Sequence, residues 1–255
     1  MATAQTIDNG HGLPLISCLH TPGSTAGRLQ NYTEQLVALL QGRVHWQPVG
    51  STESPETAKL DLRQYDLVIL NEAEWLSLRQ TSCQTAAFSA TPGQHDQPSL
   101  LLVREPCWPL QRLLLIIRGE ATDKTTIEWG VHLAQLARCT VTLLVVAPPI
   151  TYGREQFISQ ALMADTIPGR HIRHALHQLA ANQITGVLKL SHYGAERQVQ
   201  DEVTSSDYDL IILGSEPPGR LFSWRLDSLL MPLLQWTRQP VLIAGTTSLW
   251  RGSTP

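Results

Sequence analysis

Two pairs of similar segments, separated by almost the same interval, most constrain how this chain can fold. YDLVIL begins at Tyr65 and YDLIIL at Tyr208, which is 143 residues later. QPSLLLV begins at Gln97 and QPVLIAG at Gln239, which is 142 residues later. Self-similarity at a constant interval is typical of a duplicated architecture. We therefore predict that the 255-residue chain contains two related halves.

Apolar runs of strand length alternate in both halves with segments of helical periodicity. The runs are Leu13–Leu19, Val44–Val49, Tyr65–Leu70 and Gln97–Val103, and then Leu113–Ile117, Val141–Val146, Gly186–Leu190, Leu210–Leu213 and Gln239–Ala244. The periodic segments are Arg28–Leu40, Thr125–Ala137, Gln156–Asn182 and Ala195–Val203, the third of which we expect Pro168-Gly169 to break. Such alternation predicts an α/β fold in which parallel strands carry helices on both faces.

The two halves differ in length between their second and fourth strands. The interval from the second apolar run to the YDL segment is 46 residues shorter in the first half than in the second. We therefore predict two doubly wound parallel-sheet domains, a truncated one over residues 13–104 and a complete one over 110–247. The first lacks one helix and one strand.

Composition argues against several classes of function. A net charge of −3, with a pI near 6.3 and no cluster of Lys or Arg, gives no field for nucleic acid. The four cysteines have neither zinc-ligand nor disulfide-framework spacing. No apolar run approaches the ~18 residues of a membrane span, and the start lacks the apolar core of a signal peptide. We expect a cytoplasmic protein that binds neither nucleic acid nor membrane.

Motifs of known catalytic sites are also missing. The sequence has no G-x-S-x-G, no G-x-x-x-x-G-K-[ST] and no H-E-x-x-H. His171, His174 and His177 follow one another at three-residue spacing, but no carboxylate or cysteine lies suitably near them in sequence. We interpret these histidines as a solvated helix face and predict neither a metal site nor an enzyme.

The second half resembles the universal stress protein family over nearly all of its length. The resemblance is carried by RLLLIIRGE from Arg112, TIEWGVHLAQLARCTVTLLVV from Thr126, DLIILGS from Asp209 and RQPVLIAG from Arg238. It implies a five-stranded sheet in the order 3-2-1-4-5 and association through the last strand. The two QP segments would then pair the halves as an internal pseudo-dimer and cover two exposed edges.

ATP-binding members of that family carry Gly-x2-Gly-x9-Gly-Ser/Thr after the fourth strand. Laid on this sequence, the motif retains Gly214 and Ser228 but meets Pro217 and Asp227 at its other two glycines. We interpret Asp227 as the N-cap of a helix beginning at Ser228, which Pro232 should shorten or bend.

The other positions of the family's cleft are also altered. The family's aspartate at the end of the first strand falls on Arg118, although Gly119 is kept. In the first half Asn71 replaces the first glycine and no glycine follows in EAEWLSLRQ, so we expect no nucleotide there.

These replacements weaken a phosphate loop for physical reasons. Such loops bind phosphate through inward-pointing backbone N–H groups, and a proline removes one donor. Carboxylates at Glu216 and Asp227 would repel phosphate. The cations that could compensate are Arg118, Arg220 and Arg225. We therefore predict a degenerate nucleotide cleft without a bound cofactor.

Two readings of function follow from this cleft, and the sequence leaves a third open. The first is a non-enzymatic stress-response or regulatory protein. The alternative is a genuine ATP or ADP binder, with slow hydrolysis at most. It would use the amides at Gly214 and Ser215, the Ser228 hydroxyl, and Gly119 with Val146 near the base. The third, an enzyme acting on another adenylate-type ligand, depends on fold analogy alone. Association with a second copy or another protein is left open.

Overall fold

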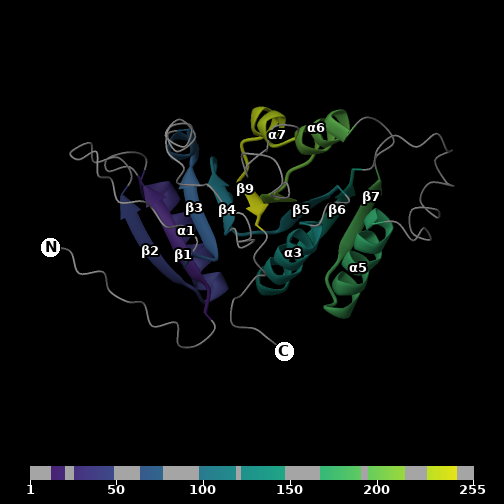
Figure 1. Cartoon of the computed structure of the whole chain (residues 1–255), viewed down its shortest axis with the longest axis horizontal. Helices are drawn as coiled ribbons and strands as arrows, with labels where there is room; N and C mark the ends of the chain where they lie inside the picture. The colour runs from purple at the N-terminus through teal and green to yellow at the C-terminus, as the bar shows by residue number, and fades with distance from the viewer. Residues whose placement is uncertain are drawn as a thin grey trace, which may run out of the picture.

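A computed structural model of the chain describes residues 13–20, 26–48, 64–76, 98–118, 122–146, 167–190, 195–215 and 229–245. Their strands form one nine-stranded sheet in the order β2-β1-β3-β4-β9-β8-β5-β6-β7 (Figure 1). The strands are β1 Leu15–His20, β2 Arg43–Pro48, β3 Leu67–Asn71, β4 Ser99–Val103, β5 Arg112–Ile117, β6 Thr140–Val145, β7 Gly186–Leu190, β8 Leu210–Gly214 and β9 Val241–Ala244. The helices are α1 Ala26–Leu40, α3 Asp123–Ala137, α5 Ile167–Ala181, α6 Ala195–Ser205 and α7 Leu230–Trp236, and residues 72–76 are also helical.

The predicted α/β fold class and strand order are confirmed. Taken in chain order, β5 to β9 lie in the sheet as 3-2-1-4-5, and all their pairings are parallel. In the described part of the first half, β1 to β4 repeat this order without its third strand. The division into two domains at residues 104 and 110 stays a prediction.

The aspartate of each YDL segment explains why that segment recurs. Asp66 accepts a hydrogen bond from the Leu15 N–H at 2.8 Å, and its own N–H donates to the Leu15 carbonyl at 2.8 Å. Asp209 does the same with Arg112, at 2.8 and 2.9 Å, and also accepts from the Gln111 N–H at 2.7 Å. One side chain therefore helps to set the register between β1 and β3 in the first half and between β5 and β8 in the second.

The central strands of the sheet are buried on both faces, as the continuous apolar runs predicted, whereas the border strands β2 and β7 are partly exposed. Along β5, Leu113, Leu115 and Ile117 face a cluster covered by α1, α3 and α5, whereas Leu114 and Ile116 face a cluster covered by α6 and α7. Figure 1 shows α6 and α7 together above the sheet and α3 and α5 on its other side. No helix among the described residues is both long and apolar enough to cross a membrane.

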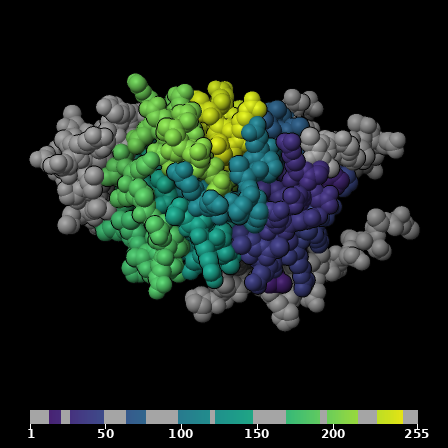
Figure 2. Space-filling view, turned by 180° about the vertical axis from the view of Figure 1, so that it is seen from behind, coloured from purple at the N-terminus to yellow at the C-terminus, as the bar shows by residue number. Residues whose placement is uncertain are grey.

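The two halves meet where β4 pairs with β9, which is the one antiparallel pairing among the described strands. Leu100, Leu101 and Leu102 lie opposite Ile243, Leu242 and Val241. Ser99, at the start of β4, is buried and accepts hydrogen bonds from Trp129 Nε1 at 2.8 Å and from the Gly245 N–H at 3.1 Å. In Figure 2 the teal segments lie between the purple N-terminal elements and the green ones, without a visible break in the described surface.

One prediction about helix termini is wrong, one stays a prediction and one is confirmed. Pro168 and Gly169 lie in the first turn of α5, where backbone N–H groups have no intrahelical acceptor and proline costs little. Residues 156–166, before that turn, lie outside the described residues, so the break of the longer segment stays a prediction. The N-cap of α7 is Leu229, so the helix does not begin at Ser228 as expected, and Asp227 lies outside the described residues. The expected shortness of the helix is confirmed, because α7 has seven residues, with Pro232 in its first turn.

Two helical glycines provide a matched test of packing on the sheet. A Cβ atom on Gly130 of α3 would lie 2.2 Å from Leu115 Cδ2, whereas one on Gly27 of α1 would meet nothing within 4 Å. We expect Gly130→Ala to lower the free energy of unfolding by about 1–3 kcal/mol, because the helix must move off β5. Gly27→Ala should raise it by up to about 1 kcal/mol. Urea denaturation measures both, and equal effects would contradict the packing argument.

Candidate functional site

Four of the predicted site residues lie at one edge of the sheet. Arg118 follows β5, Val146 follows β6, Gly214 ends β8 and Ser215 comes next, and these three strands are neighbours. The carboxyl ends of parallel strands are where open α/β sheets bind ligands. Gly119 and Ser228, the other two predicted residues, lie outside the described part of the chain. The structure thus brings four of the predicted residues to one edge, and their role in binding stays a prediction.

Arg118 connects the ends of β5 and β8. Its backbone N–H donates to Asp123 Oδ1 at 3.2 Å, and its guanidinium Nη2 donates to the Gly214 carbonyl at 3.4 Å. The cation therefore lies at the cleft position where the family resemblance expects an aspartate. A positive charge here favours an anion more than the aspartate would, but the guanidinium is already bonded to the protein.

Gly214 is required by helix packing, whatever it does for a ligand. A Cβ atom there would lie 2.3 Å from Thr122 Oγ1. The same hydroxyl donates to the Ser215 carbonyl at 2.6 Å, and Thr122 is buried. The glycine therefore lets the N-terminus of α3 approach β8 closely.

Ser215 has its backbone groups bonded within the fold. Its N–H donates to the Ala244 carbonyl of β9 at 2.9 Å, so this amide extends the sheet and does not point to a ligand. Its side-chain oxygen is fully buried and has no hydrogen-bond partner in the described structure. The alternative reading, in which the Ser215 amide binds phosphate, loses this donor.

A carboxylate and a histidine that the sequence did not connect meet beside these residues. Asp123, in the first turn of α3, is 1% exposed, and its Oδ2 lies 3.1 Å from His171 Nδ1 of α5. The interpretation of the three histidines as a solvated face is therefore wrong for His171, although His177 is exposed. No group of three or more metal-binding side chains is found in the described ranges.

The position of the Asp123 carboxylate in the first turn of α3 affects the electrostatics of the candidate site. A carboxylate in the first turn of a helix interacts favourably with the helix dipole and accepts from otherwise unpaired N–H groups. Asp123 therefore occupies the part of the α3 N-terminus that a bound anion would otherwise favour. Only the packing of α5 against α3 brings the pair together, because the two residues are 48 positions apart.

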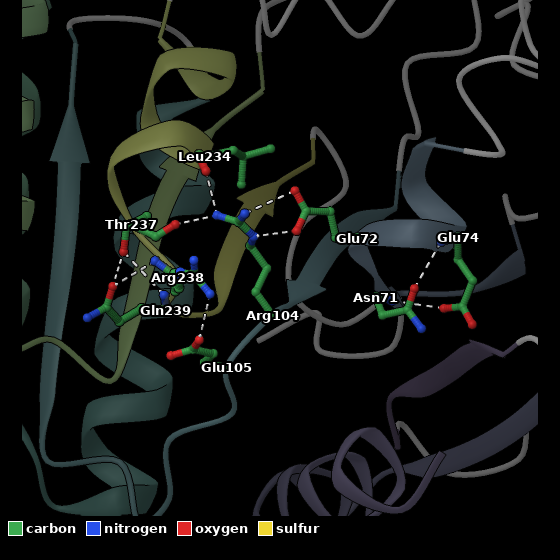
Figure 3. Close-up of polar contacts among 9 residues, drawn as sticks. All are labelled: Asn71, Glu72, Glu74, Arg104, Glu105, Leu234, Thr237, Arg238 and Gln239. Atoms are coloured by element: carbon green, nitrogen blue, oxygen red, sulfur yellow. Dashed lines mark hydrogen bonds and ion pairs between the residues drawn. The ribbon is translucent and has the colours of Figure 1, made fainter. Parts of the chain in front are cut away.

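The corresponding edge of the first half carries its own carboxylate. Asn71, at the position aligned with Gly214, ends β3 and forms a reciprocal capping box with Glu74. The Asn71 N–H donates to Glu74 Oε2 and the Glu74 N–H donates to Asn71 Oδ1, both at 2.9 Å (Figure 3). Glu74 is 1% exposed. An anionic ligand at the end of β3 would therefore meet a buried carboxylate.

Substitution of Thr122 tests how tightly the α3 N-terminus is bound to β8. Thr122→Val keeps the side-chain shape but leaves the buried Ser215 carbonyl without its donor, which should cost about 1–3 kcal/mol in the free energy of unfolding. Thr122→Ser should recover most of this loss. As a control, Thr204→Val removes an exposed hydroxyl of α6 and should change stability by less than about 0.5 kcal/mol. Equal losses for Thr122→Val and Thr204→Val would contradict the assignment.

Comparisons with known proteins agree with this architecture. The sequence model of the universal stress protein family matches residues 109–245. A putative universal stress protein from Pseudomonas aeruginosa UCBPP-PA14 is 12% identical, with a TM-score of 0.58 over 91% of this chain and 92% of that chain. A functionally unknown protein from Pseudomonas aeruginosa PAO1 is 13% identical, with a TM-score of 0.56 over the same shares of both chains.

A third solved structure extends the likeness, again at low identity. A universal stress protein from Archaeoglobus fulgidus DSM 4304 is 11% identical, with a TM-score of 0.53 over 92% of this chain and 86% of that chain. No curated protein sequence matches the chain. The solved structures support the fold over both halves, and the family match covers more than half of the chain. The protein therefore belongs to the universal stress protein family.

Proposed function

We propose that the protein is a non-enzymatic stress-response regulatory protein in which the nucleotide cleft of the second half is degenerate. The first half serves as a structural partner, joined to the second as an internal pseudo-dimer through β4 and β9. The observation that carries the proposal is that polar groups at the carboxyl ends of β5 and β8 bond to one another. Arg118 donates to Gly214 and Asp123, Thr122 donates to Ser215, and Ser215 donates to Ala244.

These bonds oppose nucleotide binding because each must be replaced by an equally good contact. A phosphate would have to draw Arg118 away from the Gly214 carbonyl and would lie near the buried Asp123 carboxylate. Leaving either protein group without a partner costs free energy that a ligand must repay. In the first half, Glu74 has the corresponding effect at the end of β3. The proposal therefore assigns no cofactor to either half.

Free thiols agree with a reducing compartment, and we propose that the protein acts in the cytoplasm. Cys18, Cys107 and Cys139 are free among the described residues. Burial raises the pKa of the Cys18 thiol to about 12, so this thiol stays protonated and unreactive at neutral pH. The partner that receives the regulatory signal is a second copy or another protein.

One observation favours the alternative, an adenine-nucleotide binding protein with slow hydrolysis at most. The Arg118 Nη2–Gly214 O contact is 3.4 Å long, which is weak for a hydrogen bond from a cation. A phosphate oxygen could replace that carbonyl at little cost and would gain a charge-assisted bond. The two readings therefore differ in whether the Arg118 guanidinium donates to the Gly214 carbonyl or to a phosphate of a ligand.

A thermal-shift titration with ATP, ADP and AMP at constant free Mg²⁺ separates these readings. For the degenerate cleft we expect no change in melting temperature with any of the three nucleotides. A nucleotide at 100 times its dissociation constant would add about 2.7 kcal/mol to the free energy of unfolding. The matched control is Arg118→Met, which removes the cation but keeps the apolar part of the side chain.

A saturable shift with the wild-type chain that disappears in Arg118→Met would overturn the proposal and establish the alternative. A shift that persists in Arg118→Met would also overturn it and would assign binding to other groups. ATP turnover that is lost in Ser228→Ala would make the protein an enzyme.

A further inference from the structure

Arg104, directly after β4, joins elements that occupy corresponding places in the two halves. Residues 72–76 follow β3 and α7 lies between β8 and β9, and both pack on the same face of the sheet through Trp75, Leu230 and Leu233. Figure 3 shows the Arg104 guanidinium between Glu72 on one side and the end of α7 on the other. Its side chain is only 16% exposed.

The contacts of Arg104 use both ends of its planar donor fork. Nε and Nη2 bind the two Glu72 carboxylate oxygens at 2.9 and 3.0 Å, which is the bidentate geometry that arginine favours. Nη1 donates to the backbone carbonyls of Leu234 and Thr237. The Leu234 carbonyl follows that of Leu233, which accepts from the Thr237 N–H, and is one of the C-terminal carbonyls that have no donor inside the helix. Arg104 therefore caps α7 with a cation from the first half.

We infer that Arg104 is a positioning residue that makes the stability of α7 depend on Glu72 in the first half. In the described structure the Glu72 carboxylate bonds to Arg104, so we expect it to act on the helix by holding the guanidinium in place. Its side chain is 47% exposed, which lets a cationic group of a partner compete for it. Neutralising or engaging Glu72 then frees Arg104 to leave the α7 carbonyls.

This coupling rests on the proposed function only in treating the first half as the partner of the second. It gives that half a regulatory role in addition to a structural one. α7 is seven residues long and has no side-chain cap at its N-terminus, so it depends on its packing against the sheet and on its C-terminal cap. The amides of Leu233 and Thr237, which donate to Leu229 and Leu233 within the helix, report on its opening.

Native-state hydrogen exchange of the full chain, without any nucleotide, tests the inference. We expect Glu72→Gln to speed exchange of the Leu233 and Thr237 amides by about threefold to tenfold, and Arg104→Met by at least as much. Arg104→Lys should give an intermediate increase, because a single ammonium cannot reach all four acceptors at once. Glu72→Gln should add nothing in the Arg104→Met background, since its effect requires the guanidinium.

The matched control is Arg238→Met, which removes an arginine paired with Glu105 at the surface, where their side chains are 77% and 60% exposed. It should leave the exchange of both amides unchanged. The inference is overturned if Glu72→Gln has no effect, or if it has the same effect with and without Arg104. An equal response to Arg238→Met would also overturn it. Glu72→Gln retains Arg104, so the test holds even if Arg104→Met folds poorly.

Discussion

The antiparallel pairing of β4 with β9 is the contact on which the arrangement of the whole molecule depends. Every other pair of neighbouring strands among the described residues is parallel. Without the pairing of β4 with β9, each of these two strands would be an exposed edge. The pairing covers both edges and leaves β2 and β7 at the borders of one continuous sheet. Ser99 strengthens the junction, because its buried hydroxyl accepts from Trp129 of α3 and from Gly245 after β9.

Polar groups at both candidate clefts bond to one another within the protein. Buried N–H, carbonyl and carboxylate groups need hydrogen-bond partners. In the second half Asp123, Arg118 and Thr122 supply these partners around the ends of β5 and β8. In the first half Asn71 and Glu74 do so at the end of β3. The two halves reach the same result with different residues.

The two halves are therefore alike in their framework and differ in the contacts at the ends of their strands. Asp66 bonds between β1 and β3 as Asp209 does between β5 and β8, so the two halves of the sheet have the same local framework. The first half has a buried capping box where the second has Gly214 packed against Thr122. Arg104, which follows β4 in the first half, places its cation at the C-terminus of α7 in the second half. This contact unites two elements that the duplication itself would keep separate.

The sequence by itself determined the fold class, and its resemblance to the universal stress protein family implied the order of the strands. Apolar runs, helical periodicity and the recurrent YDL and QP segments are local signals, and a repeated local signal implies a repeated topology. Helix termini were less certain, because α7 begins after Leu229 and not at Ser228.

Only the tertiary structure decided which side chains meet. Thr122 lies against Gly214, and Asp123 lies against His171, 48 positions away. Arg104 lies against the Leu234 carbonyl at the end of α7, 130 positions away. Spacing along the chain does not encode such contacts, because they depend on how α3, α5 and α7 pack on the sheet. The physical reason is that short-range periodicity sets each element, whereas close packing sets the neighbours of each side chain.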